Sequence, residues 1–306
     1  MNKVTGCALI ALQLFLAAAA SADDETQSKQ EIHFKPLKTA QERFLAADWT
    51  PTDQPLRMYK QTYFLFCSHS QQPNDAPTSP NPQNQVPYTY PLDRNEMKFQ
   101  VSVKGHMLGE SRNTVWFGYT QLSFWQIYDT GHSGPFRESN HEAEIIYSNR
   151  QENLPIGSGF NAGFFNSGIE HLSNGQALPR SRSWNRLYVQ AGVERNIGDD
   201  AKLALIPRVW KRLGGGSKDD DNPDITHFYG HGDIEARYYS GQKILSVIAR
   251  IHSLQMDMTM PVTSFLGFQI HNTNLHAQFT DGYGESLIDY NQRHRTFGIG
   301  FSLPFE

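Results

Sequence analysis

A histidine, a serine and an asparagine are spaced in this sequence so that two neighbouring β-strands would bring them together. His171 and Ser173 are two residues apart, and side chains at that spacing point to the same face of a strand. Asn185 follows a short polar stretch, where the next strand would return beside the first. Serine becomes a nucleophile when an adjacent base takes its proton and a third group orients that base. The three residue types therefore indicate a hydrolytic site, although a histidine and a serine at this spacing also recur by chance.

The strand predicted after this turn places the candidate site on an apolar face. The residues in phase with Asn185 are Leu187, Val189, Ala191 and Val193. In a soluble protein this face would be the core, and a serine there would never meet a substrate. On a face that contacts lipid the serine is accessible, and asparagine orients the histidine without burying a carboxylate charge in hydrocarbon.

Alternation of apolar with polar or small residues continues through most of the chain. The alternating segments lie near 60–67, 97–104, 114–126, 142–150, 159–173, 182–194, 201–211, 225–238, 242–252, 258–268, 271–281 and 294–305. They number about twelve, and single-chain bacterial barrels have an even number of strands. The pattern predicts an all-β fold, a transmembrane antiparallel β-barrel of about twelve strands. A secreted soluble β-sandwich would also alternate and is the other fold considered.

Composition restricts the class of protein further. The net charge is −4, 19% of residues are charged, and no basic block is present, which disfavours nucleic-acid binding. Mean hydropathy is −0.55. After the first 22 residues no apolar run reaches the roughly 18 residues that a membrane helix needs, whereas the alternating strands of a barrel have low average hydropathy.

The first residues have the pattern of an export signal. Lys3 precedes an apolar run from Cys7 to Ala20, and Ala20-Ser21-Ala22 is a small-residue cleavage pattern. We expect a signal peptide over 1–22, a loosely folded periplasmic arm with a possible docking role over 23–58, and a barrel over 59–306. Loss of Cys7 with the signal leaves Cys67 without an intramolecular disulfide partner.

One glutamine on a predicted lipid-facing surface indicates self-association. Gln121 has the phase of Val115, Phe117, Tyr119 and Trp125. An unsatisfied amide in hydrocarbon costs on the order of several kcal/mol, and pairing with Gln121 of a second barrel would remove that cost. The alternative is that a local bulge turns Gln121 inward.

Four separated motifs, in order, resemble the outer-membrane phospholipase A family. They are Ile169-Glu170-His171-Leu172-Ser173-Asn174-Gly175, Ser181-Arg182-Ser183-Trp184-Asn185-Arg186-Leu187-Tyr188, Asp220-Asp221-Asn222-Pro223-Asp224-Ile225-Thr226, and Tyr283-Gly284-Glu285-Ser286-Leu287-Ile288-Asp289-Tyr290-Asn291. The resemblance implies a twelve-stranded barrel of the bacterial outer membrane that hydrolyses phospholipid acyl esters, dependent on calcium and active as a homodimer. It also implies that Ser173 is the nucleophile, His171 the base and Asn185 the orienting residue, and it places Gln121 at the dimer interface.

The same resemblance implies a calcium site with oxygen ligands, which this hard cation prefers. The implied ligands are Ser133, the backbone carbonyl of Gln176, Ser181 and Asp221, with Ser133 contributed by the partner barrel. Gln176 stands where the family usually has a basic residue and Leu178 where an acidic one occurs, so calcium binding weaker than the family's is one outcome. Taken alone, the run Asp219 to Asp221 would be interpreted as a solvated acidic turn.

Two other functional classes are compatible with parts of the pattern. A non-catalytic barrel, either porin-like or a degenerate homologue, would show the same strands but would not account for Ser173, His171 and Asn185 on one apolar face. A soluble secreted lipase is less favoured, because the sequence has no G-x-S-x-G elbow between a strand and a helix.

Overall fold

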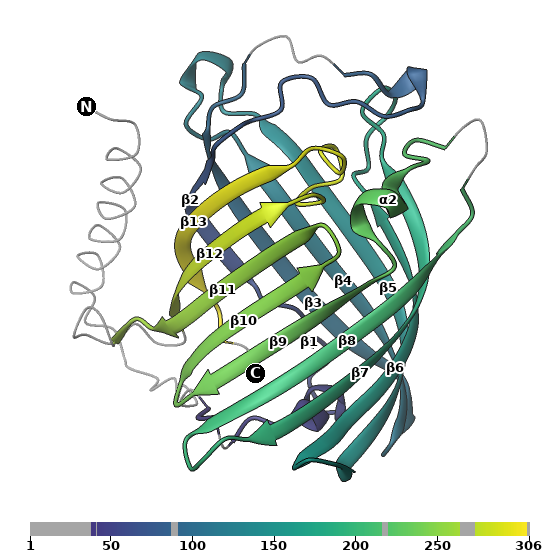
Figure 1. Ribbon diagram of the computed structural model, residues 1–306, viewed down its shortest axis with the longest axis vertical. Helices are drawn as coiled ribbons and strands as arrows, with labels where there is room; N and C mark the ends of the chain where they lie inside the picture. The colour runs from purple at the N-terminus through teal and green to yellow at the C-terminus, as the bar shows by residue number, and fades with distance from the viewer. Residues whose placement is uncertain (1–37, 41, 87–90, 216–219, 264–272, 305–306) are drawn as a thin grey trace, which may run out of the picture.

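The computed structural model describes residues 38–40, 42–86, 91–215, 220–263 and 273–304. Over these residues the chain forms a closed antiparallel barrel, in which each strand pairs with its neighbours along the chain and the last strand pairs with the first (Figure 1). The barrel strands are β2 (Tyr63–Ser70), β3 (Asn95–Glu110), β4 (Asn113–Trp125), β5 (Phe136–Gly157), β6 (Phe160–Ser173), β7 (Ser183–Asn196), β8 (Ala201–Leu213), β9 (Gly232–Ser240), β10 (Lys243–Arg250), β11 (Ser253–Pro261), β12 (Asn274–Gly282) and β13 (His294–Ser302). The predicted twelve-stranded barrel is confirmed. A two-residue strand, β1 (Arg57–Met58), adds to β3.

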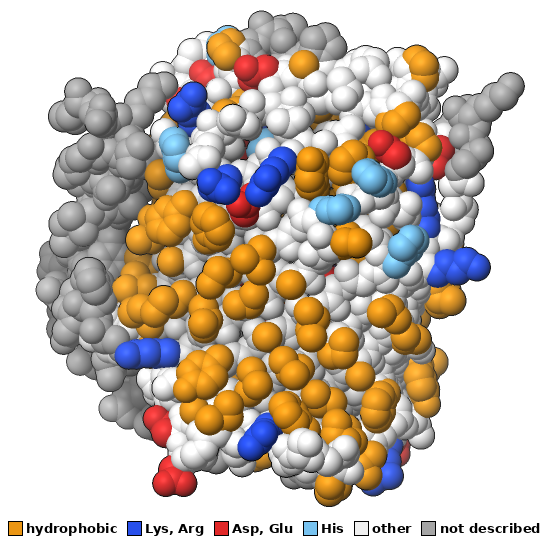
Figure 2. All heavy atoms as spheres, viewed as in Figure 1, with side chains coloured by type: hydrophobic (Ala, Val, Ile, Leu, Met, Phe, Trp, Pro, Cys, Tyr) orange, Lys and Arg blue, Asp and Glu red, His pale blue; other side chains and the backbone are white. Residues whose placement is uncertain are grey.

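The barrel wall is apolar outside and polar inside. Figure 2 shows hydrophobic side chains covering the visible outer wall, with charged side chains mostly above and below them. Ile169 is 56% exposed and Val189 55%. Of their polar neighbours, Glu170 is buried and Gln190 is partly buried. Burial of charged residues with exposure of apolar ones is the reverse of a soluble sandwich and is what a bilayer requires. None of the described residues forms a helix long and apolar enough to cross a membrane.

The segment expected to be a loose arm is ordered where the structure describes it. The 3-10 turn η1 (Leu45–Trp49) lies at one end of the barrel, and its Leu45 and Trp49 are each only 3% exposed. They pack in a cluster with Trp116, Ile146 and Phe164 of the inner wall. Local periodicity gave no sign of this packing because a single turn has too few residues to show a period. Residues 1–37, which include the predicted signal peptide, lie outside the described residues.

Several predicted strands have different boundaries in the structure; for example, β5 (Phe136–Gly157) is longer than the predicted 142–150. The strand predicted over 225–238 begins only at Gly232, since Ile225–Tyr229 forms the short helix α2, which ends at Gly230. Ile225 and Tyr229 are four residues apart, face the same side of the helix, and are buried with Trp184. The strand predicted over 258–268 is β11, which begins at Ser253, and 264–268 lie outside the described residues.

The connection between β2 and β3 crosses the opposite end of the barrel from η1 (Figure 1). Its short 3-10 turn η2 (Pro82–Asn84) reaches the β6–β7 and β8–β9 loops. Asn84 donates hydrogen bonds to the Ser181 carbonyl at 3.0 Å and to Asp221 Oδ1 at 3.2 Å. This end of the barrel is therefore held together by loop-to-loop polar contacts, and the candidate site lies beside it.

Candidate active site

The pairing of β6 with β7 brings two of the three candidate residues into direct contact. His171 and Asn185 are opposite each other in the register, and His171 Nδ1 lies 2.8 Å from Asn185 Oδ1. An amide oxygen is only an acceptor, so Nδ1 carries the proton and Nε2 of the neutral ring is left as a base. Both side chains are exposed on the outer wall.

Ser173 lies on the same face, one pleat beyond His171, at the end of β6. Its Oγ accepts a hydrogen bond from the Gly175 N–H at 3.0 Å. Gly175 has φ +62°, a conformation that glycine adopts without strain, and this conformation turns its N–H back toward the serine. The arrangement places the predicted nucleophile, the predicted base with its orienting group, and a backbone donor on one outer surface of the barrel.

The loop that follows Ser173 is held by a residue that sequence reasoning missed. Asn174 is buried, and its Oδ1 accepts from the N–H groups of Arg182 at 3.0 Å and Gln176 at 3.3 Å. Its Nδ2 donates to the Arg180 carbonyl at 2.8 Å. Burial lowers the pKa of the Arg182 guanidinium, which donates to the Ser181 carbonyl at 2.8 Å. The loop therefore returns to β7 along a defined path, and Asn174 was visible in the sequence only as part of a family motif.

Two of the four expected calcium ligands are in contact. Ser181 Oγ donates to Asp221 Oδ2 at 2.6 Å, and Gln176 lies in the same β6–β7 loop as Ser181. Ser133 is exposed in the β4–β5 loop, and within the described residues no hydrogen bond connects it to this group. A hydroxyl, a carboxylate and a backbone carbonyl are the hard oxygen donors that calcium selects, so the residues present fit the ion.

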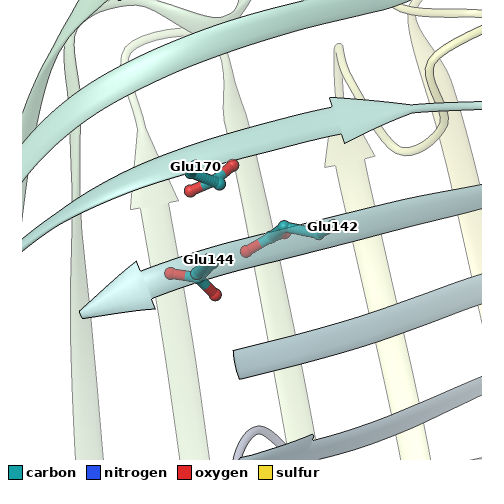
Figure 3. A group of neighbouring side chains, drawn as sticks. All are labelled: Glu142, Glu144 and Glu170. Carbon is teal, nitrogen blue, oxygen red and sulfur yellow. The ribbon is translucent and has the colours of Figure 1, made fainter. Parts of the chain in front are cut away.

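Three carboxylates inside the barrel form a separate group directly behind the candidate triad. Figure 3 shows Glu142 and Glu144 on β5 and Glu170 on β6, and one oxygen of each lies within 4.8 Å of the others. Lys60 forms ion pairs with Glu142 and, at 3.0 Å, with Glu144. Arg186 pairs with Glu170 and Arg208 approaches it at 3.5 Å. Because each carboxylate has a cationic partner, we interpret this cluster as wall packing and not as a metal site.

Comparison with known proteins identifies the family. A family model described as Phospholipase A1 matches residues 43–303. The chain belongs to the phospholipase A1 family. A putative phospholipase A1 of Neisseria meningitidis serogroup B is 37% identical over 264 residues, 82% of this chain and 65% of that protein. This chain thus spans slightly less than two thirds of the meningococcal protein. Phospholipase A1 of Salmonella typhimurium is 31% identical over 69% of this chain and 70% of its own length.

Solved structures of outer-membrane enzymes have the same fold. The calcium-bound dimer of the Salmonella typhi outer membrane phospholipase superposes with a TM-score of 0.71 at 27% identity, covering 85% of this chain and 97% of that one. Outer membrane phospholipase A of Escherichia coli gives 0.69 at 27% identity, with coverage of 82% and 98%. The predicted resemblance, the membership of a family of carboxylic ester hydrolases and the outer-membrane location are confirmed.

Within this family fold, Gln121 lies on the outer wall as predicted for an interface residue. It pairs in register with His141 of β5, and the bulge between β4 and β5 falls at Phe124 and Trp125, beyond it. The amide is not left wholly unsatisfied in a single chain, since Nε2 donates to Ser123 Oγ at 3.0 Å. The Tyr119 hydroxyl lies 3.4 Å from Gln121 Oε1, but we assign its one proton to the shorter contact of 2.7 Å with His141 Nδ1. Its role in a dimer stays a prediction.

Proposed function

We propose that this protein is a calcium-dependent phospholipase that hydrolyses acyl ester bonds of membrane phospholipids, of the A1, A2 and lysophospholipase types. Ser173 is the nucleophile, His171 the base and Asn185 the orienting group. The observation that carries the proposal is the 2.8 Å contact between His171 Nδ1 and Asn185 Oδ1 beside a serine on the lipid-facing wall. A structure of the Escherichia coli enzyme in which an asparagine is replaced by alanine is described as an active-site mutant, which supports the role of Asn185.

The chemistry follows the ordinary course of acyl transfer. His171 Nε2 takes the Ser173 proton as Oγ attacks the ester carbonyl, and the imidazolium then protonates the departing glycerol oxygen, leaving an acyl-enzyme. A water, deprotonated by the same nitrogen, releases the fatty acid and restores the serine. The Gly175 N–H, which donates to Ser173 Oγ at 3.0 Å, is the backbone donor that we propose for the oxyanion formed next to that atom. Sites of this kind usually stabilise the oxyanion with more than one donor, so a single backbone N–H leaves room for a second source of positive charge.

Calcium and a second copy would complete the site. Ser181, the Gln176 carbonyl and Asp221 of one chain, with Ser133 of the other, are the residues proposed to hold the ion. When bound there it supplies positive charge near the oxyanion. Ser133 has no described hydrogen bond to the others within one chain, so a single chain has an incomplete ligand set and the dimer a complete one. The calcium-bound dimer of the Salmonella typhi relative supports this arrangement.

A non-catalytic channel is the second candidate, and the lumen argues against it. The described interior holds a cavity of about 260 Å³, and Lys60, which lines it, forms ion pairs with Glu142 and Glu144 of β5. Charged side chains therefore fill part of the lumen. The deciding experiment is hydrolysis of phospholipid in mixed detergent micelles by the purified protein, with calcium or with chelator. The proposal requires calcium-dependent release of fatty acid by the wild type and none by Ser173→Ala. A wild-type protein that releases no fatty acid under either condition would contradict it.

A further inference from the structure

A second imidazole lies beside Ser173, on the side away from His171 and Asn185. His141 of β5 is opposite Ser173 in the β5–β6 register and opposite Gln121 in the β4–β5 register. It is half-buried on the outer wall. His171 lies on the same strand as Ser173, and its partner Asn185 lies on β7. His141 therefore lies on the opposite side of Ser173 from Asn185.

Tyr119 fixes the orientation of this second ring. The Tyr119 hydroxyl lies 2.7 Å from His141 Nδ1, and the two rings are nearly parallel, with an interplanar angle of 27°. With the hydroxyl as donor, Nδ1 is the acceptor and the imidazole proton is on Nε2. In both histidines a neighbouring side chain fixes Nδ1, but the tautomers are opposite. Nε2 of His141 carries a proton and is a donor, whereas Nε2 of His171 is unprotonated and is available as a base.

The Nε2 edge of His141 faces the turn after the nucleophile. A Cβ placed on Gly175 would lie 3.7 Å from His141 Cδ2 and 4.0 Å from Nε2, so the ring borders the open space over this glycine. No hydrogen-bond acceptor for Nε2 is found in the described part of the chain. A donor held in position by Tyr119 and left without an acceptor points to a ligand.

The polarity of the wall indicates which part of a phospholipid lies there. Ile169 and Leu187, 56% and 46% exposed, extend the outer face away from Ser173 toward the membrane interior and offer a path for an acyl chain. The glycerol and headgroup then lie at the loop end, at the level of Ser173 and His141. The Gly175 N–H donates to Ser173 Oγ, whereas Nε2 of His141 borders the space over Gly175 on the β5 side, which suits a substrate group next to the reacting carbonyl.

We propose that His141, oriented by Tyr119, binds the phosphate of the phospholipid substrate through its Nε2–H. The inference rests on the proposed phospholipase function and adds a specificity residue to it. Phosphate is the one group common to phospholipid headgroups, and losing a hydrogen bond to such a charged acceptor should lower kcat/KM by roughly 10- to 100-fold.

The test compares two substrates that give the same acyl-enzyme. One is a dipalmitoyl phospholipid and the other is p-nitrophenyl palmitate, which has no phosphate and a good leaving group. In calcium-containing micelles with a covalently crosslinked dimer, His141→Phe should lower kcat/KM for the phospholipid by at least about tenfold and change that for p-nitrophenyl palmitate less than about twofold. His141→Gln, which keeps an N–H donor, should retain part of the preference.

Tyrosine variants on the same wall provide a matched pair. Tyr119→Phe removes the group that orients His141 and should lower phospholipid hydrolysis in the same selective way, by less than His141→Phe. Tyr147→Phe removes a hydroxyl that donates to Asn113 at 2.8 Å, far along β5 from the site. It should leave kcat/KM unchanged for both substrates.

Two results would overturn the inference. Equal losses on both substrates would mean that His141 supports the reacting centre or the fold, and unchanged phospholipid hydrolysis would mean that it does not contact the headgroup. Failure of the proposed function itself would look different, because the wild type would then hydrolyse neither ester.

Discussion

Asn185 Oδ1 and His171 Nδ1 meet at 2.8 Å across two strands that are opposite each other in register. On the inner side of the same wall, the adjacent rung pairs Glu170 with Arg186. The strand pairing that places the histidine and asparagine together is thus fixed from behind by a buried ion pair. The exposed contact between His171 and Asn185 therefore depends on a register that the interior specifies.

Replacing the nucleophile is the most direct test of the site. Ser173→Ala should reduce kcat by on the order of 10⁴-fold or more, because it removes the oxygen that is proposed to attack the ester. The Oγ accepts one exposed hydrogen bond from Gly175, so its loss should leave the fold intact. Activity is measured by fatty-acid release, and folding by heat-dependent mobility in gel electrophoresis. Substantial residual activity in a folded variant would exclude Ser173 as the nucleophile.

Substitution of the proposed base and of the proposed orienting residue should lower kcat by different amounts. His171→Ala removes the group that takes the proton, whereas Asn185→Ala leaves the imidazole in place without its 2.8 Å partner. We expect the histidine variant to lose more in kcat than the asparagine variant, with similar KM for both. Equal losses would assign Asn185 a role beyond orientation. Asn113→Ala, at the far end of β4, is the control for loss of an exposed asparagine.

Ser181 should set the calcium requirement. Its Oγ is 2.6 Å from Asp221 Oδ2, and both contact Asn84. Ser181→Ala should raise the calcium concentration needed for half-maximal activity, and isothermal titration with calcium alone should show weaker binding. Thr50→Ala, a hydroxyl substitution at the opposite end of the barrel, should change neither measurement. An unchanged calcium titration in the Ser181 variant would remove this residue from the ligand set.

Local pattern and spacing predicted much of this molecule. Strand alternation located the barrel because a bilayer outside and a polar lumen inside impose a period of two on every strand. The i, i+2 spacing of His171 and Ser173 predicted, for the same reason, that both lie on one face of a strand, and in the structure both are on β6. Both are properties of a few consecutive residues.

Contacts between distant segments could not be predicted in this way. Trp49 is buried against Phe164, and Asn84 binds the Ser181 carbonyl 97 positions away. Neither residue has a local periodicity that reveals its partner. The alternation around α2 gave a misleading strand signal, because Ile225 and Tyr229 share one face of a helical turn.

Glu285 should stabilise the barrel in a pH-dependent way. Its Oε1 accepts from Lys98 Nζ at 2.8 Å, and Lys98 is 1% exposed in the interior. Burial alone would raise the pKa of Glu285, but the positive charge of Lys98 outweighs it and holds the pKa below the ordinary 4.5. A carboxyl whose pKa is lowered by folding contributes stability above its unfolded pKa, and this contribution is lost as the pH falls through the folded value.

Glu285→Gln removes the partner charge and leaves Lys98 with Gln278 at 2.6 Å. At neutral pH it should lower the free energy of unfolding by about 3 kcal/mol, and the difference from wild type should shrink as the pH falls below about 4.5. Urea unfolding in detergent, followed by tryptophan fluorescence, measures both effects. Arg293→Gln is the control, because Arg293 forms an exposed pair with Asp281 at 3.0 Å and such pairs contribute less than about 1 kcal/mol. A pH-independent difference would show that Glu285 acts through shape and not charge.

Activity should follow association of two chains. In one chain Ser133 is exposed in the β4–β5 loop, and in the described residues it makes no hydrogen bond to Ser181. Calcium-dependent turnover should therefore rise in proportion to the dimer fraction measured by crosslinking across detergent concentrations. Gln121→Leu should lower the dimer fraction only modestly, because the amide already donates to Ser123 Oγ at 3.0 Å in the single chain.

Mixing chains that carry Ser133→Ala with chains that carry Ser181→Ala tests directly whether the two serines act across the interface. Each mixed dimer keeps one intact pair of serines across the interface, so at a calcium concentration that limits both variants the mixture should recover activity that neither variant has alone. Full activity in a sample that crosslinking shows to be monomeric, or no recovery in mixed dimers, would mean that the ligand set is complete within one chain.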